Sequence, residues 1–303
     1  MTVALNPAST SAGPVLAFAL ALALAGGARA QDASPPSGPT AAAPNPAAGD
    51  GQVAPAAAPG GLSPICTDRP TKSNAACTVD AGHFQYETDL FNGTFFRSDG
   101  TTTDIYLVTN PTLKYGLSKT VDVEVNIAPY EVVRSHSDLQ DSTLGGIGDL
   151  YLRLKYNAFN TKDGKFSLSV LPYIKAPTAR LGIGNGAVEG GVIFPISYKL
   201  TDKLSITTAP EFDDFKDAVG TGRHFNTAQL VNIGYSLPAN VTVYGELWGD
   251  WNYDRAGLIQ QASADVAASW GLTNTLQLDG GLNFGLNHNT PGVQAYVGVS
   301  QKF

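Results

Sequence analysis

From residue 82 onward, apolar and polar residues alternate in runs of about ten residues. Residues 121–127 (VDVEVNI) and 150–156 (LYLRLKY) show the alternation most clearly. A period of two is typical of a β-strand whose two faces meet different surroundings, and a helix would repeat every 3.6 residues. The pattern therefore predicts an all-β protein with sharply two-sided strands.

Breaks in this pattern are of two kinds. Short turn sequences such as residues 117–120 and 272–275 alternate with longer polar segments such as residues 135–143 and 213–222. Short turns at one rim and longer loops at the other are typical of a closed antiparallel transmembrane β-barrel. The breaks predict about twelve strands, at residues 82–92, 103–117, 120–133, 146–159, 165–175, 187–200, 203–212, 224–237, 240–253, 258–272, 275–286 and 293–303. An even number places both ends of the barrel on one side, which we expect to be the periplasmic side.

An aromatic residue lies near the end of every second predicted strand, on its apolar face. These residues are Tyr115, Tyr156, Tyr198, Tyr235, Trp270 and Phe303. Aromatic rings at one depth indicate an interfacial girdle, because amphipathic rings prefer the level of the lipid headgroups. The core of a soluble β-sandwich is the alternative, but it does not require one aromatic per hairpin at the same end. The run that ends on Phe303 is also similar to the C-terminal signal of outer-membrane barrels, so we expect the barrel-assembly machinery to recognise it.

The N-terminal part of the chain has a different composition. An apolar run at residues 15–25 is followed by Ala28-Arg29-Ala30, which predicts a secretory signal peptide over residues 1–30, although no Lys or Arg precedes the run. Residues 31–64 consist mainly of Ala, Pro and Gly and are expected to form a disordered periplasmic tether. Residues 65–303 are then the barrel domain, in the outer membrane of a Gram-negative cell.

The chain contains two cysteines, Cys66 and Cys77. In an exported protein, a pair this close is expected to form a disulfide that closes a small loop. A redox pair would have the Cys-x-x-Cys spacing, and a metal site would need more ligands. We therefore expect neither a metal nor a cofactor.

The charge balance limits the partners. The sequence has 19 basic and 26 acidic residues, and removal of residues 1–30 takes away only Arg29, so the net charge changes from −7 to −8. Nucleic acid is not an expected partner of such an acidic chain. Outer-membrane lipid and a small-molecule solute are the partners that a barrel of this kind predicts.

Four segments carry a resemblance to a known family: residues 66–71 (CTDRPT), 81–87 (AGHFQYE), 145–156 (GGIGDLYLRLKY) and 172–178 (PYIKAPT). Over residues 65–303 the chain resembles the outer-membrane transporter family named for the meta-pathway of phenol degradation. The resemblance implies an outer-membrane channel for small organic compounds, and it brings no catalytic residues with it.

The positions that alternate with the apolar face are expected to line the lumen. The predicted pore-lining residues are Glu87, Asp89, Asp122, Glu124, Arg153, Lys155, Tyr173, Lys175, Glu211, Tyr244, Glu246, Trp248 and Asp250. Two hypotheses follow. The charges could form opposed walls of an open pore that favours neutral and cationic solutes, with the aromatic rings contacting an aromatic solute. They could instead pair with one another and fill a narrow lumen. We favour the pore, because no loop between the predicted strands is long enough to form a plug.

Two other classes of function fit the sequence less well. A phospholipase-type hydrolase needs Ser, His and Asn on the lipid-facing wall, and only His224 lies near an Asn at the outer end of a strand, without a suitable Ser. A structural or adhesive surface protein would be expected to have longer loops. Residues 135–141, which include His136 and Asp141, could bind a cation or simply be solvated.

Overall fold

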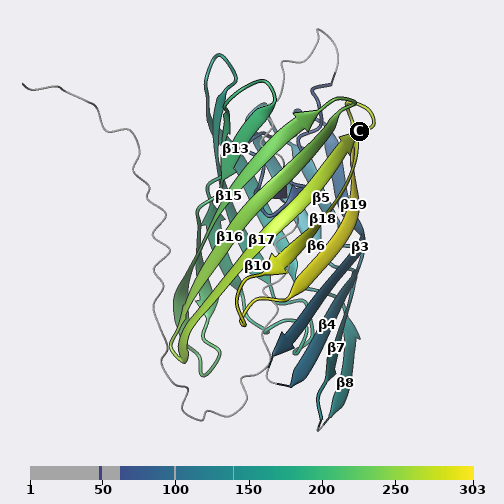
Figure 1. The fold of residues 1–303 in the computed structure, drawn as a ribbon. Coiled ribbons are helices and arrows are strands. Elements are labelled where there is room, and N and C mark those ends of the chain that lie inside the picture. The colour runs from purple at the N-terminus through teal and green to yellow at the C-terminus, as the bar shows by residue number, and fades with distance from the viewer. Residues whose placement is uncertain (1–47, 50–61, 99, 139) are drawn as a thin grey trace, which may run out of the picture. The chain divides into compact units, whose positions relative to one another are not determined.

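The computed structural model describes residues 48–49, 62–98, 100–138 and 140–303. The predicted signal peptide and the predicted tether, apart from residues 48–49 and 62–64, lie outside the described residues. The described strands form a closed antiparallel barrel (Figure 1), as the alternation predicts. The barrel closes where β19 pairs with β3, with Val293 opposite Phe95 and Lys302 opposite Gln85.

The wall consists of β3 (Phe84–Ser98), β4 (Thr101–Val108), β5 (Thr112–Gly116), β6 (Val121–Ile127), β7 (Tyr130–His136), β8 (Asp141–Gly146), β9 (Leu150–Asn160), β10 (Phe166–Ala176), β11 (Glu189–Ile193), β12 (Ile196–Lys199), β13 (Leu204–Thr208), β14 (Glu211–Lys216), β15 (Arg223–Leu237), β16 (Val241–Asp254), β17 (Gly257–Gly271), β18 (Leu276–Gly285) and β19 (Val293–Lys302). Five wall strands are each interrupted once, at β4/β5, β6/β7, β8/β9, β11/β12 and β13/β14. The described residues therefore form the twelve wall strands that the sequence predicts.

Proline explains most of the interruptions. Pro111, Pro129, Pro195 and Pro210 each fall in a gap between two parts of a strand, and Gly148 falls in the fifth gap. Proline has no N–H to donate to a neighbouring strand, so the ladder of hydrogen bonds stops there and the strand can bend. On one side of the barrel β4, β7 and β8 extend beyond the other strands, at the end far from the C-terminus (Figure 1).

The outer surface is apolar and carries the predicted aromatic girdle. Five of its six members stand opposite the first residue of a neighbouring strand, in the pairs Phe84 with Tyr115, Val121 with Tyr156, Phe166 with Tyr198, Leu204 with Tyr235 and Val241 with Trp270. The sixth, Phe303, donates its backbone N–H to Phe84. The girdle is thus confirmed at the end with the short turns, which we call the turn end. The opposite end is called the loop end.

A second band of aromatic rings lies nearer the loop end, and the sequence pattern did not reveal it. Phe212, Phe225 and Tyr253 are exposed on the outer face, and their ring centroids are 6.2 and 6.1 Å apart along the row. On β15, Phe225 lies ten residues before Tyr235 of the first girdle. Ten residues span about 33 Å along a strand, and a tilt of about 40° reduces this to about 25 Å. That is the height of the apolar band of a transmembrane barrel, so the two bands mark its edges.

The interior is polar. The largest side chains that are fully buried include Lys114, Lys155, Gln85 and Glu124, all of which belong to wall strands. No helix in the described part of the chain has the length and apolar character needed to cross a membrane. An apolar outer face and a polar interior together identify the wall as a transmembrane one.

Candidate functional site

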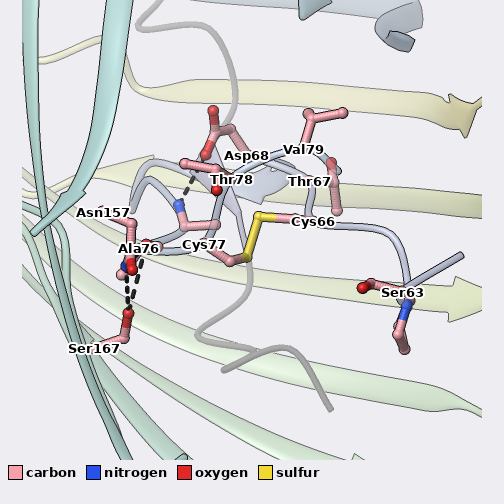
Figure 2. Close-up of a disulfide and its surroundings, with 12 residues drawn as sticks. Ser63, Cys66, Thr67, Asp68, Ala76, Cys77, Thr78, Val79, Asn157 and Ser167 are labelled. Atoms are coloured by element: carbon pink, nitrogen blue, oxygen red, sulfur yellow. Dashed lines mark hydrogen bonds between the residues drawn. A yellow bond between two sulfur atoms is a disulfide. The ribbon is translucent and has the colours of Figure 1, made fainter. Parts of the chain in front are cut away.

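A segment that precedes the first wall strand fills the turn end of the lumen. This segment, residues 62–80, is called the plug; it contains β2 (Pro70–Thr71), which pairs with β1 (Ala48–Gly49). Cys66 and Cys77 form a disulfide with their Cα atoms 6.0 Å apart, and Figure 2 shows this loop in front of the strands of the wall. Thr67, Ser73 and Ala75 have no exposed surface. The expectation that no segment could serve as a plug is therefore wrong: it considered the loops between strands and overlooked the chain before them.

Polar atoms of the wall bind the plug's backbone. The Asn157 side chain donates a hydrogen bond to the carbonyl oxygen of Ala76 (2.6 Å), to which Ser167 also donates (Figure 2). Gln85 donates to the carbonyl oxygen of Cys66 (2.5 Å). The backbone N–H of Val79 donates to Asp122 at 2.9 Å. These bonds satisfy backbone groups that would otherwise be buried without partners.

Asp68 of the plug lies between two lysines of the wall. Lys155 Nζ lies 2.7 and 2.8 Å from the two carboxylate oxygens of Asp68, and Lys114 also forms an ion pair with it. The same lysines contact Glu87 (2.7 Å from Lys114) and Glu124 (3.0 Å from Lys155). All five side chains are buried, so each charge depends on its neighbours for compensation.

Arg69 joins the plug to β3 and β18 of the wall. Its Nη1 lies 2.5 Å from Asp89, and its Nε and Nη2 lie 3.0 and 2.8 Å from Asp279 Oδ1. The guanidinium also lies over Tyr296, 5.9 Å from the ring centroid. A Cβ atom at Gly298 would lie 2.0 Å from Nη2, so a larger residue there would displace the guanidinium from this position. Charge, shape and hydrogen bonding therefore all select arginine here.

Lys72 makes the third charged contact of the plug. Its Nζ lies 2.5 Å from Asp265 and 5.2 Å from the centroid of the Trp248 ring. The Glu246 carboxylate accepts hydrogen bonds from the backbone N–H groups of Lys72 (3.0 Å) and Ser73 (3.2 Å). Two acidic residues of the plug, Asp68 and Asp80, and two basic ones, Arg69 and Lys72, thus each meet wall groups of opposite charge.

All thirteen predicted pore-lining residues lie on the inner face of the wall, but the plug divides them. Six contact it directly: Glu87, Asp89, Asp122, Lys155, Glu246 and Trp248. Glu124 does not touch the plug itself but pairs with Lys155, which does. Five lie beyond it towards the loop end: Arg153, Tyr173, Lys175, Glu211 and Asp250. Tyr244 lies near the turn end with its hydroxyl 3.0 Å from that of Ser269.

The predicted opposed charged walls are largely replaced by local ion pairs. Lys155 binds Asp68, and Lys175 lies 2.6 Å from Glu189 and 3.4 Å from Asp149. Arg153 differs, because its Nε is buried without a hydrogen-bond partner among the described residues. For the two lysines, the hypothesis of mutual pairing describes the structure better than that of opposed walls.

The loop-side half of the lumen, beyond the plug, contains a connected group of polar side chains. The Tyr173 hydroxyl donates to Asp213 at 2.7 Å. The Asn226 amide donates to both Asp213 (3.0 Å) and Asp250 (2.9 Å), and its Oδ1 is buried with no partner in the described structure. Glu211 lies on the same strand as Asp213, two residues earlier, and faces the same way. Carboxylates therefore predominate at this level.

An apolar patch lies beside these carboxylates, inside the barrel. Leu171, Ile193, Ala209 and Leu230 form one buried cluster, against which Tyr173 and Trp248 pack. Sequence reasoning missed this patch because it assigned apolar residues to the lipid side. It also missed Asp213, because it ended that strand at residue 212 whereas β14 continues to Lys216.

His224, the candidate for a lipid-facing hydrolase site, faces the interior. It is 9% exposed, whereas Phe225 beside it is 50% exposed on the outer face. Its Nδ1 lies 3.0 Å from Asp217 and 3.4 Å from Asp254. In the described structure its hydrogen-bonding partner is a carboxylate, and the Ser-His pair that hydrolysis needs is not formed there.

Residues 67–303 match the model of the family described as "Putative MetA-pathway of phenol degradation". The chain belongs to this family. The match includes residues 67–80 of the plug as well as the whole wall. A comparison with curated protein sequences gives no match.

Among solved structures, this family member is similar to a COG4313 outer membrane channel from Pseudomonas putida F1, with 16% sequence identity, a TM-score of 0.60, and coverage of 75% of this chain and 98% of that one. The NanC porin shares 10% identity, with a TM-score of 0.47 and coverage of 72% and 100%. The CymD monoaromatic hydrocarbon channel shares 8% identity, with a TM-score of 0.42 and coverage of 74% and 88%. At such identities, the similarity to the Pseudomonas channel shows the fold alone.

Proposed function

We propose that this protein is an outer-membrane channel for the passive uptake of small organic solutes, including aromatic ones. Solutes enter at the loop end, contact the apolar patch and the carboxylates of the loop-side half, and leave past the plug. The observation that carries the proposal is the pairing of an apolar patch with hydrogen-bond acceptors inside the same lumen. The family's description, which refers to phenol degradation, supports an aromatic solute.

The arrangement suits a solute with an apolar ring and a polar hydrogen. Leu171, Ile193 and Leu230 offer apolar contact to a ring, while Asp213 and Asp250 accept hydrogen bonds from a hydroxyl or amino group. Excess negative charge in a low-dielectric channel favours neutral and cationic solutes and repels anions. We therefore expect uptake of neutral and cationic organic compounds in preference to carboxylates of the same size.

The location in the cell belongs to the same proposal. Residues 1–30 would direct export and be removed, the turn end with the plug would face the periplasm, and Phe303 would be recognised by the barrel-assembly machinery. N-terminal sequencing of the protein isolated from outer-membrane fractions would then begin at Gln31. Finding the protein in the inner membrane or the cytoplasm would contradict this part of the proposal.

The channel itself is tested by reconstitution. The mature protein in a planar bilayer should give small conductance steps with a preference for cations, and liposomes that contain it should take up phenol-sized neutral solutes faster than empty liposomes. Absence of both conductance and solute flux would overturn the channel. A preference for anions would contradict the role given to the acidic lumen. Phospholipid hydrolysis in detergent that is lost in His224→Ala would instead support an enzyme.

A further inference from the structure

Three side chains that could bind a metal ion converge at the loop end of the barrel, away from the plug and the apolar patch. Asp217 follows the end of β14, His224 is the second residue of β15, and Asp254 is the last residue of β16. These three strands are neighbours in the wall, so their ends meet at one point of the rim. One ligand atom from each residue lies within 4.8 Å of the others.

The spacing of these atoms suits a small divalent cation. His224 Nδ1 lies 3.0 Å from Asp217 Oδ1 and 3.4 Å from Asp254 Oδ2. Zinc with bonds of about 2.0 Å in tetrahedral geometry places its donor atoms about 3.3 Å apart. One imidazole nitrogen and two carboxylate oxygens are donors that zinc accepts, whereas Ca²⁺ and Mg²⁺ prefer oxygen alone.

The surrounding backbone holds the two carboxylates in place. Asp254 Oδ1 accepts a hydrogen bond from Ala256 N–H, and its Oδ2 accepts one from Ala218 N–H, both at 2.7 Å. A Cβ atom at Gly222 would lie 2.1 Å from Asp217 Oδ2, so the chain can pass beside Asp217 because residue 222 is glycine. Supporting contacts of this kind orient ligands in metal sites.

Charge provides an independent argument. The side chains of Asp217 and Asp254 are 2% and 5% exposed. Arg255 Nε lies 3.3 Å from Asp217 Oδ2, but the Arg255 side chain is 76% exposed. Besides His224, the two carboxylates are bound by two backbone N–H groups and one solvated arginine, so in the described structure one negative charge has no cationic partner. A divalent cation would supply that partner.

We propose that Asp217, His224 and Asp254 bind a divalent transition-metal ion, with Zn²⁺ as the best fit and water as a further ligand. This site departs from the sequence-based expectation of no metal. The bound ion joins residues 217–222, between β14 and β15, to the connection between β16 and β17 at the mouth of the lumen. The proposal does not depend on transport, because it concerns the rim alone.

The test uses the full-length mature protein without a histidine tag, in detergent, after removal of metal with EDTA. Titration with ZnCl₂, followed by calorimetry and metal analysis, should show one equivalent of Zn²⁺ bound per chain. Co²⁺ should give the visible absorption of a tetrahedral site and be displaced by Zn²⁺. Failure of the wild-type protein to bind one equivalent of Zn²⁺ would overturn the proposal, and so would stoichiometric binding of Ca²⁺ without Zn²⁺.

Variants locate the site. His224→Ala should abolish the stoichiometric binding, and Asp217→Asn and Asp254→Asn should each weaken it at least tenfold. The matched control is His136→Ala, which removes the histidine paired with Asp141 at the exposed ends of β7 and β8. It should bind Zn²⁺ like the wild type. Binding that is lost in His136→Ala and retained in His224→Ala would overturn the assignment.

A structural readout complements binding. Zn²⁺ should slow tryptic cleavage after the exposed Arg255 in the wild type and leave it unchanged in Asp254→Asn. The gel-shift of the unheated barrel confirms that each variant is folded. If a variant does not fold, the stoichiometry and Co²⁺ spectrum of the wild type still decide the proposal.

Discussion

The two halves of the lumen use the same kinds of residue in opposite ways. In the turn-side half, the acidic residues Asp89, Asp265 and Asp279 face the cations Arg69 and Lys72 of the plug. In the loop-side half, Asp213 and Asp250 face an asparagine and a tyrosine instead, beside an apolar patch. The first half is built to hold a segment of its own chain. In the second half Lys175 still pairs with Glu189, but Asp213 and Asp250 accept hydrogen bonds from Tyr173 and Asn226 and have no ion pair among the described residues.

This difference separates closure from selectivity. Buried ion pairs are specific, because a charge left without its partner in the interior is costly, so they define one position for the plug. Carboxylates bound by neutral donors are not neutralised by a cation of the protein, and their oxygens can act on whatever enters the lumen. Changes in the turn-side half should therefore alter whether the channel is open, and changes in the loop-side half should alter what passes through it.

Removal of the plug should have the largest effect. Deleting residues 31–80 leaves the twelve wall strands complete and takes away the side chains that fill the turn end. We expect the single-channel conductance to rise several-fold over that of the mature protein, with the barrel still resistant to detergent. Unchanged conductance in a folded deletion variant would mean that the plug does not close the lumen.

Arg69 should contribute most to the position of the plug. Arg69→Ala leaves Asp89 and Asp279 buried without their partner, which costs about 3–5 kcal/mol in comparable cases. We expect openings in single-channel records to become frequent, and Gly298→Ala to reproduce part of the effect by crowding the guanidinium. The control is Arg97→Ala, since Arg97 is an exposed residue of β3. Equal opening frequencies in both arginine variants would contradict this role.

The disulfide should have a smaller effect on the same property. Cys66 and Cys77 are 11 residues apart, and closing a loop of that size restricts the released plug by about 3 kcal/mol. Cys66→Ser combined with Cys77→Ser should raise the opening frequency less than Arg69→Ala does. A reducing agent should raise it in the wild type and leave the double variant unchanged. An effect of reductant on the double variant would assign the change to something other than the disulfide.

The sequence predicts those features of the two halves that depend on residues close together in the chain. Strand alternation and one aromatic per hairpin are local patterns, so the twelve strands and the girdle from Tyr115 to Phe303 follow from them. The plug depends on contacts between residues far apart in the chain, such as Arg69 with Asp279 and Thr67 with Ser300. Residues 62–80 show no strand periodicity. The sequence signal for partners in the wall is the group of charged residues between the two cysteines, Asp68, Arg69 and Lys72.

The loop-side half was predicted in part. Tyr173, Glu211 and Asp250 follow from the register of their strands, whereas Asp213 was missed because strand ends are hard to place by polarity alone. The inward apolar residues were missed for a different reason. Alternation places each residue on one of the two faces of its strand, but the rule that apolar residues face lipid assigned these residues to the outer face. Leu171 shares its face with Tyr173, so register applied without that rule would have found it.

Substitutions in the loop-side half should change the ion selectivity of the channel without changing how often it opens. Asp213→Asn combined with Asp250→Asn keeps the shape of the group and removes two negative charges, each worth about 1 kcal/mol to a cation at 4 Å in water. We expect the preference for cations, measured from reversal potentials in a salt gradient, to fall about fivefold per charge removed. Opening frequency should stay unchanged. The matched control is Asp163→Asn in an exposed turn, and a comparable loss of selectivity there would refute the role of the lumen carboxylates.

The smallest expected effect is a pH dependence of the plug at Asp80. Burial raises the pKa of this carboxyl, but hydrogen bonds from Lys302 Nζ (2.9 Å) and Ser63 N–H (3.0 Å), with the charge of the lysine, lower it by more, so the pKa lies below its ordinary value. The contact is therefore fully present above the ordinary carboxyl pKa of about 4 and is lost as the pH falls through the lowered value.

Since Asp80 is partly exposed, this contact should contribute no more than about 1 kcal/mol. Asp80→Asn should raise the opening frequency at pH 7 by less than the disulfide variant does, and the difference from the wild type should shrink as the pH falls through the lowered pKa of Asp80, below which both side chains are neutral. A difference that does not shrink on acidification would show that Asp80 acts through its shape or its hydrogen bonds. The charged contacts of the plug would then be those of Asp68, Arg69 and Lys72.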